Sequence, residues 1–143
     1  MNPMRSIFAA IAALLLAACA SETGAAAPAA AKPDPIGTWN IASLPAGQDG
    51  KRPFLEFRGD GQMGGNAGCN SFGGSYTLGA GDSITFGPLR QTKMYCGEPQ
   101  MQAEARVVGA LAKATRLEKS GAVLILRDAD GKDLLELERA YPP

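Results

Sequence analysis

From position 36 to its end, the chain alternates short apolar stretches with clusters of glycine, aspartate and other turn formers. Several of these stretches show the period-2 alternation of half-buried strands. Tight turns are marked by Gly59-Asp60-Gly61 and by Asp128-Ala129-Asp130-Gly131, and the second predicts a closing hairpin. Such regular spacing favours a small antiparallel barrel or sandwich, so the predicted fold is mainly β. The predicted strands cover residues 37–41, 54–58, 62–64, 73–78, 83–86, 122–126 and 134–137.

One segment has helical periodicity instead. Pro99 suits the first position of a helix, and Glu98 places negative charge at the positive end of the helix dipole. Apolar residues then recur at three- and four-residue steps, which predicts one helix packed on the sheet, an α+β element in a mainly β fold. The predicted apolar stripe is Met101, Ala105, Val108 and Leu111, while Gln102, Glu104 and Arg106 are predicted to face away.

The largest apolar side chains of these elements are the candidate core. Nine glycines between positions 59 and 81 add places where strands can bend or pack closely. A phosphate-binding loop is disfavoured there, because the Gly-Lys-Ser/Thr ending and the strand-to-helix context are missing. The predicted core residues are Trp39, Phe57, Phe72, Phe86, Val108, Leu111, Leu124, Leu126 and Leu137.

The first eighteen residues have the layout of a secretion signal. A basic stretch at Arg5 precedes an apolar run over residues 7–16, which is shorter than the roughly 20 residues of a spanning helix. Leu16-Ala17-Ala18-Cys19 resembles the bacterial lipobox, which implies cleavage before Cys19 and acylation of this residue. Several acyl chains on one residue give stable membrane anchoring. Ala20 follows, where inner-membrane retention would use aspartate, so we expect the outer membrane, with the domain facing the periplasm.

The segment after Cys19 is expected to be a tether. Residues 20–35 are rich in alanine and proline and contain no aromatic and no β-branched apolar residue that could bury surface. Such a chain spans roughly 20 Å on average and about 50 Å when drawn straight. The predicted organisation is therefore a signal over residues 1–18, a lipidated cysteine and tether over 19–35, and one domain over 36–143.

Charge and composition exclude several functions. The chain has fourteen basic and fourteen acidic residues, so it offers no basic stripe for nucleic acid. It contains no histidine, the residue on which general acid–base catalysis most often depends. Ser71 lacks the first glycine of a nucleophile elbow and has no evident base partner, and Asp128 and Asp130 fit the role of turn formers. We therefore expect a protein that is not an enzyme.

A glycine-rich stretch in the middle of the domain carries a specific signature. The stretch over residues 65–76, Gly-Asn-Ala-Gly-Cys-Asn-Ser-Phe-Gly-Gly-Ser-Tyr, resembles the signature of the META domain, also called the HslJ-like domain. Gly37-Thr38-Trp39 at the start of the domain, Thr92-Lys93-Met94-Tyr95-Cys96 before the helix, and the closing hairpin match the same family.

The resemblance implies a compact antiparallel β-barrel-like fold with one packed helix. It also implies an envelope role linked to stress responses and, in members similar to HslJ, to antibiotic tolerance. It supplies no catalytic residue and no cofactor. It marks Cys69 and Cys96 as a structural pair, and its remaining motif positions, of unassigned role, are Asn70, Phe72, Tyr76, Thr92 and Met94.

Two interpretations of the cysteine pair stay open. With Cys19 assigned to lipid, Cys69 and Cys96 are two thiols in an oxidising compartment, which favours one disulfide. A disulfide that closes the loop between these two cysteines would stabilise the domain by about 3.5 kcal/mol, if it acts by lowering the conformational entropy of the unfolded chain. The alternative is a soft-metal site for Cu(I), in which Met94 and Met63 join the two cysteines.

Two classes of function also stay open. In the first, a monomeric lipoprotein, attached to the membrane by its lipid, acts through contacts with other envelope proteins, for example as inhibitor of an envelope-directed enzyme. In the second, the barrel binds a small ligand, since a closed barrel of about eight strands can hold one small molecule. The helix stripe favours the first class, because it must bury against something and so fill the interior.

Overall fold

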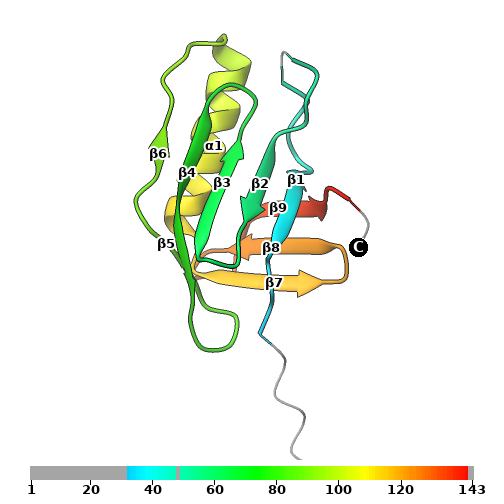
Figure 1. Ribbon diagram of the computed structural model, residues 1–143, viewed down its shortest axis with the longest axis vertical. Helices are drawn as coiled ribbons and strands as arrows, with labels where there is room; N and C mark the ends of the chain where they lie inside the picture. Colours follow the sequence, from blue (N-terminus) through cyan, green and yellow to red (C-terminus); the bar gives the residue numbers. More distant parts are fainter. Residues whose placement is uncertain (1–31, 48, 142–143) are drawn as a thin grey trace, which may run out of the picture.

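A computed structural model describes residues 32–47 and 49–141. Over these residues the chain forms nine β-strands and one α-helix (Figure 1). The strands follow the order β5-β4-β3-β2-β1-β9-β8-β7, with β6 paired to β4, and all pairs are antiparallel. The strands are β1 (Gly37–Ile41), β2 (Phe54–Phe57), β3 (Gln62–Asn66), β4 (Ser71–Leu78), β5 (Ile84–Phe86), β6 (Arg90–Gln91), β7 (Arg116–Ser120), β8 (Val123–Arg127) and β9 (Asp133–Arg139).

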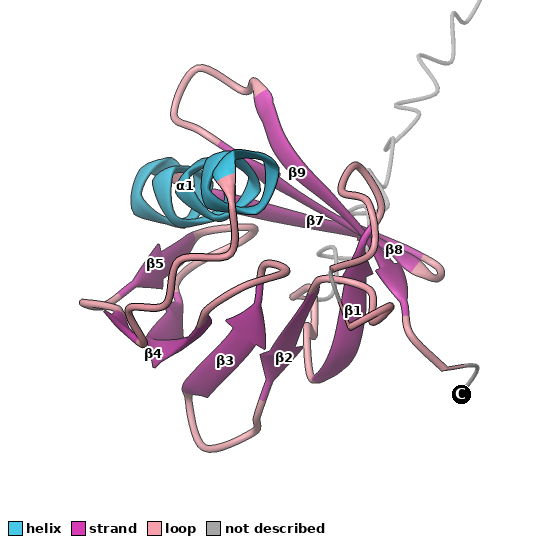
Figure 2. Cartoon of the chain, turned by 90° about the horizontal axis from the view of Figure 1, so that it is seen from above, coloured by secondary structure: helices cyan, strands magenta, loops and turns pink. Residues whose placement is uncertain are grey.

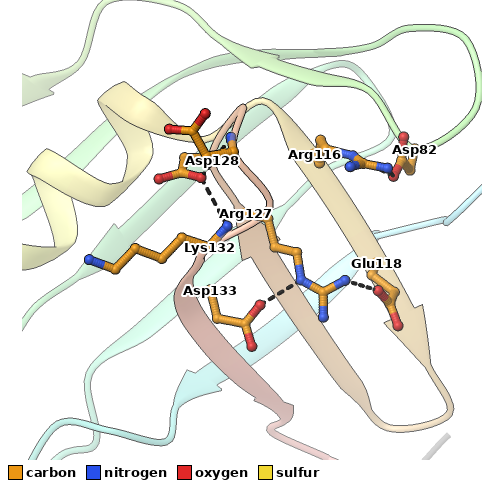
Figure 3. Close-up of polar contacts among 8 residues, drawn as sticks. Asp82, Arg116, Glu118, Arg127, Asp128, Lys132 and Asp133 are labelled. Atoms are coloured by element: carbon orange, nitrogen blue, oxygen red, sulfur yellow. Dashed lines mark hydrogen bonds and ion pairs between the residues drawn. The ribbon is translucent and has the colours of Figure 1, made fainter.

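The two ends of this sheet, β5 and β7, meet and nearly close a barrel. A single bridge pairs Ser83 with Arg116, and the Leu117 N–H donates to the Asp82 carbonyl at 2.7 Å. The Arg116 guanidinium adds an ion pair to the Asp82 carboxylate at 2.9 Å across the same seam (Figure 3). The mainly β, barrel-like antiparallel fold with one helix is therefore confirmed.

Helix α1 (Glu98–Lys113) lies beside the barrel, between β5 and β9 when the molecule is seen from above (Figure 2). Pro99 stands in its first turn as predicted. The predicted inward face was wrong in part, because Ala105 is exposed and Glu104, predicted to face away, is buried. The inward face consists largely of small alanines and one carboxylate. A prediction based on the most hydrophobic residues therefore pointed to a neighbouring face of the helix. The buried helix residues are Ala103, Glu104, Val107, Ala110 and Leu111.

The core fills the space inside the barrel and under the helix. Seven of the nine predicted core residues are buried there, from Trp39 at 0% exposure to Phe72 at 5%. Phe86 is only partly buried but packs against this core. Val108 was wrongly assigned to the core, since the rotation of α1 leaves it partly buried on the rim of a surface hollow.

Two strands were not predicted. In β7 only Leu117 is buried among five residues, so the sequence Arg-Leu-Glu-Lys-Ser shows no readable alternation. The strand forms because it completes the barrel next to β8, a tertiary effect that outweighs local preference. The other, β6, has only two residues and pairs with Phe72 and Gly73 of β4.

The closing hairpin carries ion pairs on its outer face (Figure 3). The Arg127 guanidinium on β8 bridges Glu118 on β7 and Asp133 on β9. In the turn, the Asp128 carboxylate accepts hydrogen bonds from the backbone N–H groups of Asp130 and Lys132 at 3.0 and 2.9 Å. The role of turn former predicted for Asp128 is thereby confirmed.

The chain enters the domain at the start of β1. Pro35 is buried, and its carbonyl accepts a hydrogen bond from the Trp39 indole at 2.6 Å. Contacts with the domain therefore begin within the last residues of the predicted tether. The signal over residues 1–18, the lipidation site Cys19 and tether residues 20–31 lie outside the described residues. Where the structure describes the chain, it has no helix long and apolar enough to span a membrane.

Candidate functional site

The signature residues gather where the β3–β4 turn meets the loop that precedes α1. A disulfide joins Cys69 to Cys96, whose Cα atoms are 5.8 Å apart. Of the two interpretations of this pair, the structure therefore contains the disulfide. The methionines of the soft-metal alternative do not join it, because Met63 is a core residue at 2% exposure and Met94 is 55% exposed at the surface.

Asn70 is the centre of a buried polar cluster. Its side chain is 1% exposed and uses both donors and both acceptor positions of the amide group. The Nδ2 atom donates to Glu104 Oε1 at 3.1 Å and to the Met94 carbonyl at 3.0 Å. The Oδ1 atom accepts from Thr92 Oγ1 at 2.8 Å and from the Met94 N–H at 2.7 Å. A fully satisfied amide of this kind fixes the segments that it joins.

Glu104 is the functional residue that the sequence analysis missed. Its carboxylate is 4% exposed and accepts hydrogen bonds from the Asn70 N–H at 3.0 Å, from the Asn70 amide, and from Gln91 Nε2 at 3.1 Å. These donors offset the cost of removing a carboxylate from water. The available signal was its spacing, because Glu104 shares a helix face with Val107 and Leu111 at three and seven residues.

Residues 92–96, which we call the clamped loop, are held at three points. At its start, Thr92 exchanges hydrogen bonds with the Ser71 backbone at 3.0 and 3.2 Å. In its middle, both backbone polar groups of Met94 bind the Asn70 side chain. At its end, Cys96 is linked covalently to Cys69. We use the name clamp for the five residues whose side chains hold this loop, two of which belong to the loop itself: Cys69, Asn70, Thr92, Cys96 and Glu104.

The other two motif positions serve the core. Phe72 is 5% exposed and packs inside the barrel. Tyr76 is buried, and its hydroxyl donates to the Arg58 carbonyl at 2.7 Å. Burial raises the pKa of the Tyr76 phenol above its ordinary value, and the negative charges of Asp34 and Asp60 raise it further. The hydroxyl therefore remains a proton donor across the neutral range.

The clamped loop presents two exposed side chains on its outer surface. Met94 is 55% exposed and Tyr95 is 72% exposed, although both backbone polar groups of Met94 are bound by Asn70. The Tyr95 hydroxyl donates to Glu98 Oε1 at 3.3 Å, at the start of α1. Aromatic side chains and methionine are enriched in protein interfaces. The arrangement can thus offer a rigid apolar contact.

The barrel interior is occupied by its own side chains. Trp39, Leu55 and Phe57 are each no more than 1% exposed. A hollow of about 480 Å³ lies outside the barrel, between the β5–β6 connection and α1, and Phe86 and Val108 are among its lining residues. The centre of the barrel is thus filled by core side chains, and this hollow lies outside it.

The family model for the META domain matches residues 35–141. Among solved structures, the NMR structure of a protein from Burkholderia xenovorans has a TM-score of 0.60 at 22% identity, covering 99% of this chain and 100% of that one. The crystal structure of a DUF4847 family protein from Bacteroides vulgatus has a TM-score of 0.52 at 14% identity, covering 75% of this chain and 94% of that one. These likenesses show the fold. No curated protein matches the sequence.

Proposed function

This chain belongs to the META-domain family, and from that premise we propose that it is a lipoprotein of the outer membrane whose domain contacts another envelope protein. The contact surface is the clamped loop, with Met94 and Tyr95 as its exposed side chains. The protein contributes in this way to envelope maintenance and to tolerance of stress or antibiotics, and it acts without catalysis.

One observation carries this proposal: buried polar groups and a disulfide fix a loop whose own side chains are exposed. Asn70 satisfies the Met94 backbone completely, yet the neighbouring Tyr95 side chain is 72% exposed. Ordering a loop on binding costs affinity, and a loop that is already fixed avoids this cost. Tyrosine also offers a large contact area with few rotatable bonds.

The position of the loop agrees with an anchored protein. In Figure 1 the described chain enters at the bottom of the barrel, and the loop between β6 and α1 lies at the top. If acyl chains on Cys19 hold the amino terminus at a bilayer, the clamped loop faces away from that bilayer. Replacing Cys19 with alanine is then expected to release the full chain from the membrane fraction of its own cells, and continued membrane association would refute the anchor.

Site-specific photo-crosslinking tests the contact surface. A photoreactive phenylalanine analogue is placed at Tyr95 of the full chain, and at Tyr141 as a control with nearly the same exposure, 74%. We expect one crosslinked protein of defined mass from position 95 only, and its yield should fall when Met94→Ser is added. Equal yields from the two positions, or a yield that Met94→Ser leaves unchanged, would contradict the proposal.

A further inference from the structure

Two cations point into the barrel at the end where the chain enters. Arg139 pairs with Trp39 between β9 and β1, and Lys119 pairs with Leu124 between β7 and β8. Directly paired residues lie on the same face of a sheet, and both Trp39 and Leu124 are 0% exposed in the core. Lys119 and Arg139 therefore occupy inward-facing positions in the outermost layer of side chains at this end of the barrel. We call this region the barrel mouth.

The barrel mouth encloses a small hollow. The Arg139 guanidinium lies 4.9 Å from the centre of the Trp39 ring, and Lys119 Nζ lies 6.0 Å from it. Beside them is a space of about 210 Å³, lined by these three residues together with Gly121 and Ala122 of the β7–β8 turn. Because Gly121 and Ala122 are small, the cationic groups can be approached from outside.

Hydrogen bonds to backbone carbonyls, and not ion pairs, hold the two cations within the described residues. The Asp34 carboxylate, on the residue whose carbonyl binds Lys119, accepts from the Ile36 N–H at 3.0 Å. Lys119 Nζ donates to the Asp34 carbonyl at 3.0 Å, and Arg139 Nη1 donates to the Ile36 carbonyl at 2.8 Å. Among residues 32–47 and 49–141, none of the ion pairs includes either cation. Glu118 and Glu138 directly precede Lys119 and Arg139 in the sequence. Because successive side chains of a strand point to opposite faces, these two carboxylates lie on the outer face of the sheet. Two cations beside the one carboxylate of Asp34 leave the hollow with a net positive charge, which attracts an anion.

The barrel mouth is also the end nearest to the proposed anchor. Cys19 precedes Lys32, the first described residue, by thirteen positions. A chain of that length reaches at most about 45 Å when fully extended, which confines this end to the neighbourhood of a bilayer. Ile36 is 47% exposed at the chain entry, and Tyr141 is 74% exposed two residues after Arg139. Tyrosine and long basic side chains suit the boundary between apolar and polar lipid regions.

We propose that the barrel mouth binds the phosphate of an anionic phospholipid, so that this end of the domain rests on the bilayer. The inference depends on the proposed anchorage. Each Lys or Arg near an anionic membrane strengthens binding by about fivefold, and the effect is screened by salt. Such weak binding is sufficient to dock the domain, because the acyl anchor holds it at a high effective concentration next to the phospholipid headgroups. Docking at this end orients the clamped loop toward the periplasm.

The experiment anchors the chain chemically, so that it does not depend on lipidation in cells. With Cys69 and Cys96 in the disulfide, Cys19 of the chain from residue 19 onward can be coupled to a maleimide lipid in nanodiscs. Paramagnetic lipids then broaden the NMR signals of amides close to the headgroups. We expect strong broadening of Gly121 and Ala122 in discs containing phosphatidylglycerol, and several-fold less in discs of phosphatidylcholine alone.

Charge variants decide whether the barrel mouth is responsible. The double variant K119Q/R139Q should reduce the broadening to the phosphatidylcholine level, which corresponds to a loss of about thirtyfold in binding. The charge-conserving variant K119R/R139K should retain it, which separates loss of charge from loss of fold. The control K51Q/R52Q removes the same charge from two exposed residues elsewhere and should have no effect.

Three results would overturn the inference. These are equal broadening in both lipids, broadening that survives K119Q/R139Q, and a response of Gly121 and Ala122 to glycerol phosphate in solution without any response to the discs. The last would assign the site to a soluble anion. None of these results bears on the clamped loop, because Tyr95 is tested separately by photo-crosslinking and Cys19 by fractionation.

Discussion

The two ends of the barrel are built in opposite ways. At the clamp, a disulfide and a buried amide–carboxylate pair fix the clamped loop, and Asn70 and Glu104 are no more than 4% exposed. At the barrel mouth, exposed hydrogen bonds from Lys119 and Arg139 to backbone carbonyls hold the entering chain. The signature residues Cys69 and Asn70 lie at the end that is held rigid, whereas Trp39, which matches the same family, lies at the barrel mouth. Asn70, Phe72 and Tyr76 are buried, whereas Met94 is 55% exposed on the loop that Asn70 holds.

The physical chemistry of the two ends predicts unequal sensitivity to mutation. Removing one partner from a buried, saturated cluster leaves the other group desolvated and unpaired, which is costly. Exposed cations bound to carbonyls contribute little, because water can replace either partner. Stability measurements on four sets of variants can therefore test whether the two ends differ in this way.

The largest effect is expected at Asn70. Asn70→Ala removes the amide donor to the buried Glu104 carboxylate and leaves Thr92 and the Met94 backbone without their Asn70 partners. The backbone N–H of residue 70 and the Gln91 amide still donate to Glu104. We expect a loss of about 3–5 kcal/mol in the free energy of unfolding, measured by urea denaturation. Asn66→Ala, in the same signature but only partly buried, is the control and should cost about 1 kcal/mol.

A double variant sharpens this first prediction. Asn70→Leu combined with Glu104→Leu removes both polar partners and should cost much less than the sum of the single changes. If Asn70→Ala cost no more than its control, the cluster would not be the structural centre of the clamp.

The disulfide is expected to rank second. Cys69→Ala and Cys96→Ala each remove the same bridge and should each cost about 3.5 kcal/mol, on the view that the bridge restricts the unfolded chain. The melting temperatures of the two variants should agree. Unequal losses, or two reactive thiols at these positions in the native domain, would show that the bridge is not the common cause.

Tyr76, towards the barrel mouth, should give a smaller effect that depends on pH. Its raised pKa in the folded state means that its stabilising contribution is complete below the ordinary tyrosine pKa, near 10, and is lost as pH rises through the folded value. Tyr76→Phe removes the hydrogen bond to Arg58 and should cost about 1 kcal/mol at neutral pH. The difference from wild type should shrink above pH 10, and a constant difference would argue against this titration.

The smallest effect is expected for the barrel-mouth cations. Lys119→Gln and Arg139→Gln should each change the free energy of unfolding by less than about 1 kcal/mol, the range of exposed cation–π contacts and hydrogen bonds. Thermal denaturation of both variants checks this value. A loss as large as that of Asn70→Ala would remove the difference between the two ends.

Much of the fold could be predicted because its elements satisfy local rules. Strand β1 has the predicted bounds, and the hairpin of β8 and β9 has alternating buried positions around an aspartate–glycine turn. Strand β7 could not be predicted, since its single buried residue, Leu117, gives no period. Its existence depends on barrel closure against the segment before β5, which no local pattern encodes.

The candidate site was predicted less completely than the fold. The expected oxidising compartment and the presence of two remaining cysteines indicated the pairing of Cys69 with Cys96. The resemblance to the family motif marked Asn70 as a motif position but gave it no role. The carboxylate of Glu104 was assigned to solvent because charged residues are rarely buried unless they have partners. Its partner stands 34 positions away in sequence, so only the folded structure brings the two together.

Hydrogen exchange at the Met94 backbone amide measures how firmly the clamped loop is held. This N–H belongs to a loop, yet it donates to the buried Asn70 Oδ1 at 2.7 Å. In the native chain we predict protection comparable to that of amides in the central strands, lost in Asn70→Ala under conditions where the barrel stays folded. Exchange as fast as in an unstructured peptide would contradict the claim that the signature residues hold the clamped loop rigid.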